Sequence, residues 1–259
     1  MSPDKRFGMD KSVLITGAAR RIGRRIALSM AADGWAICAH YGSSRAEAEA
    51  LVDEIAAAGG RAQAFGADLR DADAPAQLVE ACRGAFGGLD CLINNASRFD
   101  YDEVATMTAE GWSKHMEINL RAPVFLAQAF AAGLGSERTG DIINIIDQRV
   151  WKLAPTHFTY TISKSALWTA TQTLAQAFAP RIRVNAIGPG PTLPSAQQTE
   201  ADFEREAGAM LLGRGTSPAE IADAVKYILS APAMTGQMIA LDGGQHLLWR
   251  TPDIQHQGS

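Results

Sequence analysis

Three residues of the 259-residue sequence could together transfer a proton: Asp147, Tyr160 and Lys164. Tyr160 and Lys164 are four residues apart in a helical pattern, which places the phenol and the ammonium on one face, one turn apart. A nearby ammonium stabilises tyrosinate, so the phenol becomes a better proton donor near neutral pH. Asp147 ends an apolar run thirteen residues before the tyrosine. These residues predict an acid/base catalytic site to which a carboxylate contributes.

Alternating strands and helices must position these side chains. Seven apolar runs fit strands covered on both faces, at residues 12–17, 36–41, 62–69, 91–96, 141–147, 182–190 and 237–244. Helical patterns lie between them, including residues 24–34, 46–60, 108–134 and 165–179. Such alternation implies right-handed crossovers between parallel strands. We expect an α/β fold: a single-domain, Rossmann-like, doubly wound parallel β-sheet of about seven strands flanked by helices.

The whole chain, residues 1–259, is expected to form one catalytic domain with tails at about 1–10 and 250–259. This fits the size of α/β folds, which at about 250 residues are commonly one domain. An irregular segment at about 190–215 follows the sixth run and could include one or two short helices. We expect it to cover the substrate, because ligands of such sheets bind beyond the carboxyl ends of the strands. A plain surface loop is the alternative.

Composition argues against several kinds of partner. The net charge of -4 and the pI near 5.7 do not suit a nucleic-acid or anionic membrane surface. No apolar stretch reaches the roughly 18 to 20 residues of a membrane span, and the start of the chain lacks a signal-peptide core. The expected location is therefore the cytoplasm. Cys38, Cys82 and Cys91 lack metal-ligand spacing, so we expect buried thiols and no metal.

A glycine-bearing turn follows the first apolar run. Gly17 and Gly23 lie around this turn, where a helix begins. Glycines there let the main chain approach a pyrophosphate, and the free N–H groups of the helix start favour anions. Because the turn follows the first strand of a β–α–β pattern, it predicts a nucleotide-binding site.

The motifs TGAARRIG, NNAS, RVNAIGPG and the Tyr-x-x-x-Lys pair together resemble the short-chain dehydrogenase/reductase family, from Ser12 to about Gly244. The glycine motif of that family reads TG-x-x-x-G-x-G, and Arg21 stands in place of its middle glycine. An arginine there can reach phosphate oxygens, and Arg20 beside it adds charge. Two solvated arginines at a helix start are the alternative.

The end of the second apolar run distinguishes the possible cofactors. An NAD enzyme usually carries an acid here that accepts from the ribose 2′-hydroxyl, and this acid would repel a 2′-phosphate. The sequence has no carboxylate between this run and Glu47, and offers instead His40, Tyr41, Ser43, Ser44 and Arg45. The predicted cofactor is NADP(H).

The family resemblance implies further roles. Asp68 and Leu69 resemble the pair that flanks the adenine, and Asn119 matches the catalytic asparagine that helps hold a water beside the lysine. Asn94 precedes the segment that lines the cofactor and fits a paired buried amide equally well. The implied cofactor-binding residues are Gly17, Arg20, Arg21, Ile22, Gly23, His40, Tyr41, Ser43, Ser44, Asp68, Leu69, Asn95, Ala96, Ser97, Tyr160, Lys164, Pro189 and Gly190.

Asp147 restricts the expected class of substrate. In the general family, a serine stands at this position and donates a hydrogen bond to a substrate carbonyl. An ionised aspartate has no proton to donate and suits the N–H groups of an amidine- or guanidine-like edge. The segments GAARRIG, AHYGSSRAEA, NNASRF, IINIIDQRV and LDGGQHL resemble, more narrowly, pteridine reductases and dihydromonapterin reductases. This resemblance implies hydride transfer from NADPH to a ring carbon of a dihydropterin- or dihydrofolate-type substrate, with a proton delivered to the adjacent nitrogen. The implied substrate-binding residues are Arg21, Ser97, Phe99, Asp147 and Tyr160, with Phe99 stacking the pterin against the nicotinamide.

Two other functions remain open: reduction of another carbonyl or alcohol substrate, and a non-catalytic NADP(H)-binding sensor, which would need no proton donor. Phe99 could instead pack on a helix, and Asp147 could be a structural ion-pair partner. The histidines receive no catalytic role, and His157 fits a surface or capping position better than the pocket. Trp151 and the proline-rich segment after Gly190 are better candidates for substrate contact.

The resemblance also implies a homotetramer, since the family usually assembles as tetramers. The long apolar helix patterns at residues 108–134 and 157–179 would bury faces against a neighbour. Apart from copies of itself, the expected partner is a small-molecule substrate.

Overall fold

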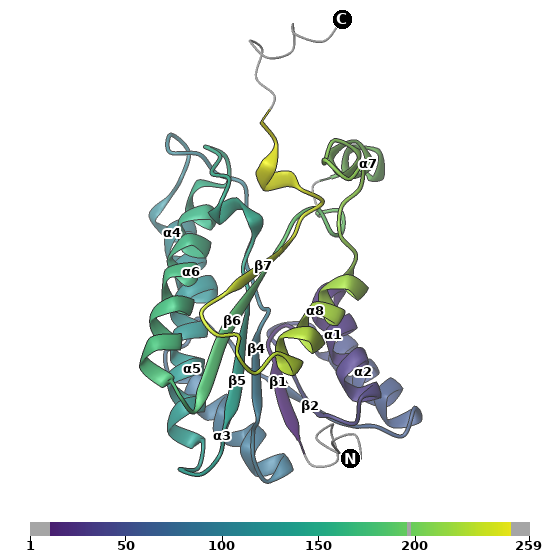
Figure 1. The fold of residues 1–259 in the computed structure, drawn as a ribbon, viewed down its shortest axis with the longest axis vertical. Coiled ribbons are helices and arrows are strands. Elements are labelled where there is room, and N and C mark those ends of the chain that lie inside the picture. Colours follow the sequence, from purple (N-terminus) through teal and green to yellow (C-terminus); the bar gives the residue numbers. More distant parts are fainter. Residues whose placement is uncertain (1–10, 196–197, 250–259) are drawn as a thin grey trace, which may run out of the picture.

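One sheet of seven parallel strands runs through the molecule in the order β3-β2-β1-β4-β5-β6-β7 (Figure 1). The computed structural model describes residues 11–195 and 198–249. The strands are β1 (Ser12–Ile15), β2 (Ala36–Tyr41), β3 (Arg61–Gly66), β4 (Cys91–Asn94), β5 (Gly140–Ile145), β6 (Ile182–Pro189) and β7 (Met238–Leu241). The strand order reverses between β1 and β4, where doubly wound sheets bind their ligands. The predicted fold class is confirmed, and each predicted run overlaps one strand.

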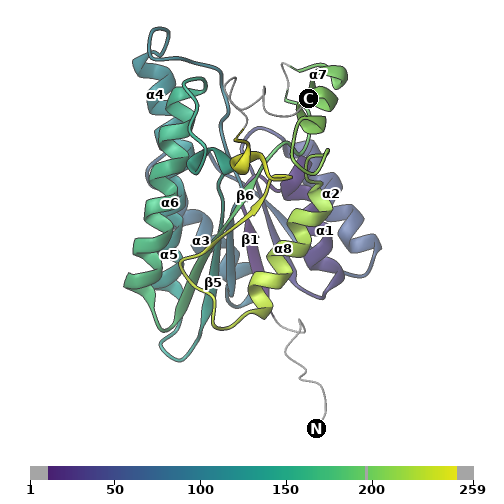
Figure 2. The same ribbon diagram turned by 45° about the horizontal axis from the view of Figure 1, so that its top comes forward.

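Helices cover both faces of this sheet (Figures 1 and 2). One face carries α1 (Arg21–Ala32), α2 (Arg45–Ala57) and α8 (Pro218–Ser230). The other carries α3 (Ala74–Phe86), α5 (Ala122–Gly133) and α6 (Phe158–Phe178), with α4 (Ala109–Met116) beside α6. The helix α7 (Glu200–Gly208) and the short helix η3 (Gln245–Leu247) lie together beyond one end of the sheet.

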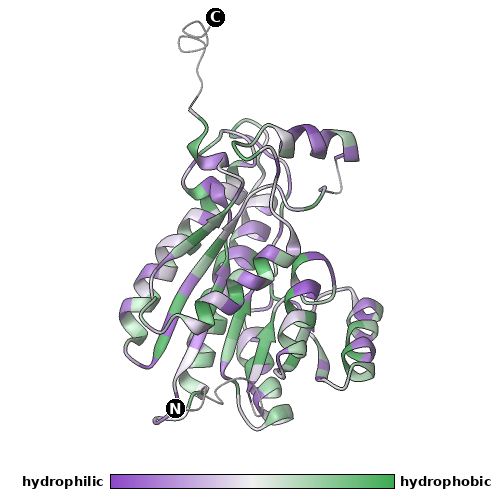
Figure 3. Cartoon of the chain, turned by 45° about the vertical axis from the view of Figure 1, so that its right-hand side comes forward, coloured by the Kyte–Doolittle hydropathy of each residue, from purple (hydrophilic) through white to green (hydrophobic). Residues whose placement is uncertain are grey.

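A separate apolar core lies on each face of the sheet, between the strands and the helices that cover them. Ile26 of α1 and Val225 of α8 are fully buried in one core, and Leu126 and Phe130 of α5 are buried in the other. Because both faces are covered, the central strands carry buried apolar residues that point to both faces, and Figure 3 shows green on them interrupted by a few polar positions. The three cysteines are buried, as predicted.

The predicted helix over residues 108–134 is three segments instead of one. A π-helical turn, η1 (Glu117–Arg121), separates α4 from α5. Pro123 lies at the start of α5 and has no N–H to donate to the carbonyl four residues earlier, which its ring would also crowd. The wider turn accommodates the proline, and π-turns of this kind often occur at functional sites. This turn carries Asn119.

The segment predicted as a cover, at about 190–215, includes α7, so its second half contains one short helix. The predicted tails at 1–10 and 250–259 lie outside the described residues. Among the residues that the structure describes, no helix is both long and apolar enough to cross a membrane.

Candidate active site

A single cavity of about 870 Å³ opens at the carboxyl ends of the central strands. Nearly all the predicted site residues line it, although they come from segments far apart in the sequence. They are Gly17, Arg20, Arg21, Ile22, Gly23, His40, Tyr41, Ser43, Ser44, Asp68, Leu69, Asn95, Ala96, Ser97, Phe99, Asp147, Tyr160, Lys164, Pro189 and Gly190. Asn119, predicted as catalytic, and Arg45, considered for the cofactor, are not part of this lining, and Arg45 pairs with Glu49.

The glycine turn closes tightly around the start of α1. Gly17 has a left-handed φ of +64°, and a Cβ on Gly23 would lie only 2.3 Å from the Gly17 carbonyl oxygen. No side chain caps the N-terminus of α1, and its first turn contains no acidic residue. The free N–H groups there and the positive end of the helix dipole favour an anion.

Arg21 has a second role that the sequence did not predict. Its guanidinium donates to the carbonyl oxygens of Pro194, at 2.8 Å, and Leu193, at 3.2 Å. Its backbone is left-handed, with φ of 54°, which is uncommon for a residue other than glycine. Arg21 therefore ties the glycine turn to the segment after β6, across the mouth of the cavity.

The His40 side chain lines the cavity, but both of its ring nitrogens contact main-chain groups of the protein. Its Nδ1 accepts from the Gly17 N–H at 3.1 Å, and its Nε2 lies 3.1 Å from the Ala67 carbonyl oxygen. Burial lowers the pKa of this imidazole, so the ring is neutral and Nε2 carries the proton. With both nitrogens engaged, His40 fixes the glycine turn. Ser43, Ser44 and Arg20 are among the polar residues that line this end of the cavity and can face a nucleotide.

The segment after β4 joins the nucleotide end to the centre of the cavity. Asn95 Nδ2 donates to the carbonyl oxygens of Thr16 and Gly17, at 2.9 and 3.1 Å. Asn94 does not line the cavity; its amide donates to Asn144 Oδ1 at 2.8 Å, which supports the paired buried amide.

Asp147, Tyr160 and Lys164 meet as predicted. Tyr160 Oη donates to Asp147 Oδ2 at 2.8 Å, and Asp147 Oδ1 accepts from the Arg149 N–H at 2.8 Å. The aspartate is the N-cap of the short helix η2 (Gln148–Val150), which follows β5. Lys164 lies one turn after Tyr160 in α6 and donates to the Ile145 carbonyl oxygen at 2.9 Å.

The charges of this group differ from the expectation for a tyrosine beside an ammonium. Burial raises the pKa of Asp147, and burial followed by the Asp147 charge raises the pKa of Tyr160 well above its ordinary value. Burial lowers the pKa of Lys164 to about 8. The sequence predicted that the ammonium would activate the phenol, but the partner of the hydroxyl is the carboxylate. Tyr160 is consequently held as a protonated phenol that donates toward Asp147.

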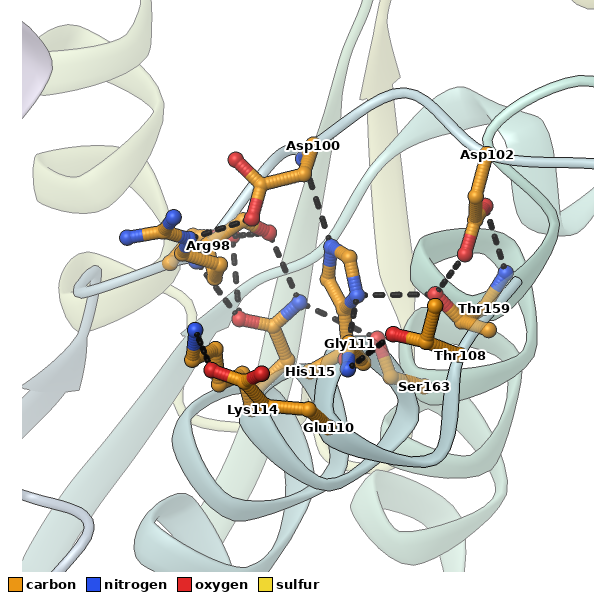
Figure 4. A network of polar contacts seen from close by, with 12 residues as sticks. Arg98, Asp100, Asp102, Thr108, Glu110, Gly111, Lys114, His115, Thr159 and Ser163 are labelled. Carbon is orange, nitrogen blue, oxygen red and sulfur yellow. Dashed lines mark hydrogen bonds and ion pairs between the residues drawn. The ribbon is translucent and has the colours of Figure 1, made fainter. Parts of the chain in front are cut away.

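Asn119 fixes the segment after β4 through contacts with Arg98 and Ser163, both labelled in Figure 4. Its Oδ1 accepts from the Arg98 N–H at 2.8 Å, and its Nδ2 donates to the Arg98 carbonyl oxygen at 2.9 Å and to Ser163 Oγ at 3.0 Å. Ser163 belongs to the same helix as Tyr160. The predicted role of Asn119 in holding a water stays a prediction, whereas these contacts position the main chain between Ser97 and Phe99.

A buried polar network also holds the segment after β4 in place (Figure 4). Thr159 donates to Asp102, and its hydroxyl lies 2.7 Å from Nδ1 of His115, which is 1% exposed. His115 Nε2 accepts from the Asp100 N–H at 3.3 Å. No sequence pattern indicated this network, because its members come from three separate segments.

His157 is the N-cap residue of α6, the kind of position expected for it, but its side chain makes no capping hydrogen bond and lines the cavity. Its ring stacks on Phe99 with centroids 4.3 Å apart and planes 9° from parallel. Phe99 in turn contacts the Tyr160 ring edge-on at 4.7 Å. His157 has a left-handed φ of 54°, and such strain often marks functional sites. A histidine directly before the helix that carries the tyrosine was the available signal.

Of the other residues predicted to contact the substrate, those after Gly190 line the cavity and Trp151 does not. Residues after Gly190 line the cavity as expected, namely Pro191, Thr192, Leu193, Ser195, Gln198, Phe203 and Glu206. Trp151 is outside the lining and contacts His246 edge-on at 5.2 Å. Arg149 and Tyr101 line the cavity and were not predicted. In residues 11–195 and 198–249, no cluster of three or more His, Cys, Asp or Glu side chains could hold a metal ion.

Known proteins share this sequence pattern. Residues 17–246 match a protein-family model described as Enoyl-(Acyl carrier protein) reductase. An uncharacterised oxidoreductase of Methylorubrum extorquens is 37% identical over 242 residues, covering 90% of this chain and 97% of that protein. The 3-oxoacyl-(acyl-carrier-protein) reductase FabG of Staphylococcus aureus is 32% identical over 244 residues, covering 92% of this chain and 99% of that protein.

Solved structures share the fold as well. FolM alternative dihydrofolate reductase 1 from Brucella canis, complexed with NADP, matches with a TM-score of 0.93 and 46% identity, covering 97% of this chain and 100% of that chain. A short chain dehydrogenase from Burkholderia cenocepacia in complex with NADP matches with a TM-score of 0.85 and 32% identity, covering 91% of this chain and 98% of that chain. Both similarities extend over nearly the complete sheet and its helices.

Proposed function

The chain belongs to the short-chain dehydrogenase/reductase family, and we propose that within this family it is an NADPH-dependent reductase of pterins. The observation that carries the proposal is the hydrogen bond between Tyr160 and the half-buried carboxylate of Asp147 at the cavity wall. The FolM structure, whose name is that of a dihydrofolate reductase, supports it by its similarity.

The nucleotide end of the cavity fits NADP(H). Gly23 leaves room for the main chain to approach a pyrophosphate, since a Cβ there would overlap the Gly17 carbonyl oxygen. The uncapped start of α1 offers N–H groups, and Arg20 adds charge. Around the end of β2, Ser43 and Ser44 line the cavity where an NAD enzyme would present an acid. When bound, NADPH supplies the hydride for the reduction.

The substrate end suits a flat ring with a polar edge. Phe99 is 42% exposed and presents an aromatic surface for stacking, while His157 packs on it. Asp147 can accept from the amidine-like N–H groups of a pterin, and Ser97 lies on the same cavity wall. A carboxylate at this place favours such a ring over a simple ketone, which needs a donor.

Tyr160 and Asp147 would deliver the proton. The raised pKa of Tyr160, caused by burial and the neighbouring carboxylate, keeps the phenol protonated until a substrate nitrogen accepts its proton. Asp147 accepts the hydrogen bond of the phenol beforehand, and a proton from solvent would convert the tyrosinate back to the phenol afterwards. Lys164 holds its position through the Ile145 carbonyl and places a positive charge beneath the pair.

A substrate panel tests the proposal. We expect the purified protein to oxidise NADPH with dihydrobiopterin, dihydromonapterin or dihydrofolate, and to prefer these to generic ketones. Asp147→Ser should reduce pterin turnover and raise ketone turnover, because serine restores a donor to the carbonyl. If this variant kept full pterin activity and gained none on ketones, the assignment of Asp147 would be refuted.

Reduction of an acyl-chain or other carbonyl is the second candidate. The family description and the FabG relative favour it, since both are named for acyl-carrier-protein substrates. Asp147 argues against it for the reason given above. A non-catalytic sensor is disfavoured because the complete Tyr160, Lys164 and Asp147 group would then have no use.

We further propose a homotetramer acting in the cytoplasm. An exposed apolar surface runs along α4, η1 and α5, with Trp112 38% and Phe125 39% exposed. Surfaces of this kind often bind a neighbouring subunit. Sedimentation should give about four times the 27.6 kDa chain mass, and a monomer would contradict the assembly.

A further inference from the structure

Charged side chains around the cavity are almost all engaged by other groups of the protein. Arg98 pairs with Asp100, and Glu206 accepts from Gln198 Nε2 at 2.6 Å. The other engaged groups are Arg20 with Glu47, Arg21 with Leu193 and Pro194, Asp68 with Arg70, Asp147 with Tyr160, and Lys164 with Ile145.

Arg149 is the exception. Its main-chain N–H holds Asp147, but within residues 11–195 and 198–249 no hydrogen bond or ion pair engages its guanidinium. The residue is half-buried in η2 and lines the cavity. A guanidinium in such a place is partly removed from water, and the nearby Asp147 carboxylate is already hydrogen-bonded to Tyr160 and to the Arg149 main chain.

The position of Arg149 is at the substrate end, not the nucleotide end. Its positive charge lowers the pKa of the Asp147 carboxyl and of the Tyr160 phenol against the larger effect of burial, and adds to burial in lowering the pKa of His157. The geometry agrees, because the Arg149 N–H bonds Asp147 at 2.8 Å and Arg149 lines the same cavity as Asp147, His157 and Tyr160. Glu206, another anion of the lining, is already held by Gln198.

We propose that Arg149 binds an anionic group, a carboxylate or a phosphate, on the side chain of the substrate. This inference rests on the proposed function and makes it more specific: the preferred pterins carry a negative charge beyond the ring. A planar guanidinium suits both oxyanions, because it can donate two parallel hydrogen bonds. Ring recognition stays with Phe99, Ser97 and Asp147, while Arg149 selects among side chains.

Matched substrates test this directly. Steady-state constants are measured for dihydroneopterin, which is neutral, for its monophosphate, and for dihydrofolate, which ends in carboxylates. The variants are Arg149→Gln, which removes the charge, and Arg149→Lys, which keeps it. Arg98→Gln is the control, because it removes another arginine of the same cavity that is already paired with Asp100. NADPH binding and the unfolding midpoint confirm that each variant is folded.

We expect Arg149→Gln to raise the ratio of the anionic to the neutral KM by about 10- to 100-fold, the range for a hydrogen bond to a charged group. Arg149→Lys should recover most of this loss, and Arg98→Gln should change the ratio less than about threefold. In the wild type, KM for the anionic substrates should rise with salt. A change for dihydrofolate alone identifies carboxylate as the ligand, and one for the phosphate alone identifies phosphate.

The inference is overturned if Arg149→Gln changes kcat equally for all three substrates and leaves the KM ratio unchanged, because the arginine would then only tune Asp147 and Tyr160. It is also overturned if Arg98→Gln moves the ratio as much. If the wild type reduces all three pterins but the ratio does not move, only this inference fails. If the wild type reduces none of them, the proposed function itself fails.

Discussion

The two ends of the cavity are built in different ways. At the nucleotide end, Gly17, Gly23 and the uncapped start of α1 present main-chain groups whose properties do not depend on pH. At the substrate end, Tyr160 and Lys164 are buried, Asp147 is half-buried, and the pKa values of all three are shifted. Binding of the cofactor therefore depends on backbone shape, and proton transfer depends on burial and charge. Changes at the two ends should have separable effects.

The largest expected effect is on chemistry alone. Tyr160→Phe removes the proton donor but keeps the ring against Phe99, so kcat should fall by about two orders of magnitude or more. NADPH affinity, measured by fluorescence titration, should change little. Near-normal turnover would show that another group delivers the proton.

At the opposite end, Gly23→Ala should impair binding. The added Cβ would meet the Gly17 carbonyl oxygen at 2.3 Å, which forces the turn apart. We expect NADPH to bind at least about tenfold more weakly and the fold to lose about 1–3 kcal/mol. The shape of the pH profile of residual activity should stay the same.

Gly84→Ala is the matched control. Nothing lies within 4 Å of a Cβ at this position in α3, so the substitution should stabilise the helix by about 0.5–1 kcal/mol and leave NADPH binding intact. Equal losses in the two variants would remove the special role of the Gly23 turn.

The pH dependence of stability and of kcat should report the deprotonation of Lys164. Burial lowers its pKa from 10.5 to about 8, so between these values the unfolded state binds more protons than the folded state. The lysine's contribution to the free energy of unfolding therefore increases from about pH 8 to 10.5, while the native ammonium is lost. We expect kcat to decline by up to about tenfold per pH unit above about 8.

Lys164→Met separates the effect of the lysine charge on kcat from its effect on the free energy of unfolding. The variant should lack this alkaline decline in its remaining activity, and its stability difference from the wild type should change over the same pH range. Profiles of kcat and of the urea midpoint measure both. If wild-type kcat stayed constant up to pH 10, the lowered lysine pKa would be wrong.

The smallest effect is expected at His157, whose ring packs behind Phe99. Asparagine tolerates the left-handed backbone but has no ring, so His157→Asn should raise the pterin KM about three- to tenfold with little change in kcat. His157→Phe keeps a stacking surface and should stay closer to the wild type. An unchanged KM in the asparagine variant would mean that Phe99 needs no support.

Main-chain features were the easiest to predict from the sequence. The glycine turn, the seven strands and the helical spacing of Tyr160 and Lys164 follow from local periodicity and residue type. The hydrogen-bond partners of individual side chains were harder to predict. His40 was expected to face the cofactor, yet both its nitrogens are used within the protein. The carbonyl partners of Arg21 lie more than 170 residues away, so no local pattern could indicate them.

The sequence by itself determined a parallel α/β sheet, a nucleotide-binding turn and the three groups for acid/base chemistry, because these depend on short-range spacing. Only the tertiary structure decided how those groups are charged. Burial and the 2.8 Å contact with Asp147 raise the pKa of Tyr160, where the sequence alone suggested an ammonium that lowers it. The fold likewise left the Arg149 guanidinium without a hydrogen bond or ion pair among the described residues, although its main-chain N–H bonds Asp147. Desolvation and pairing are properties of the packed molecule, since they depend on neighbours that distant segments provide.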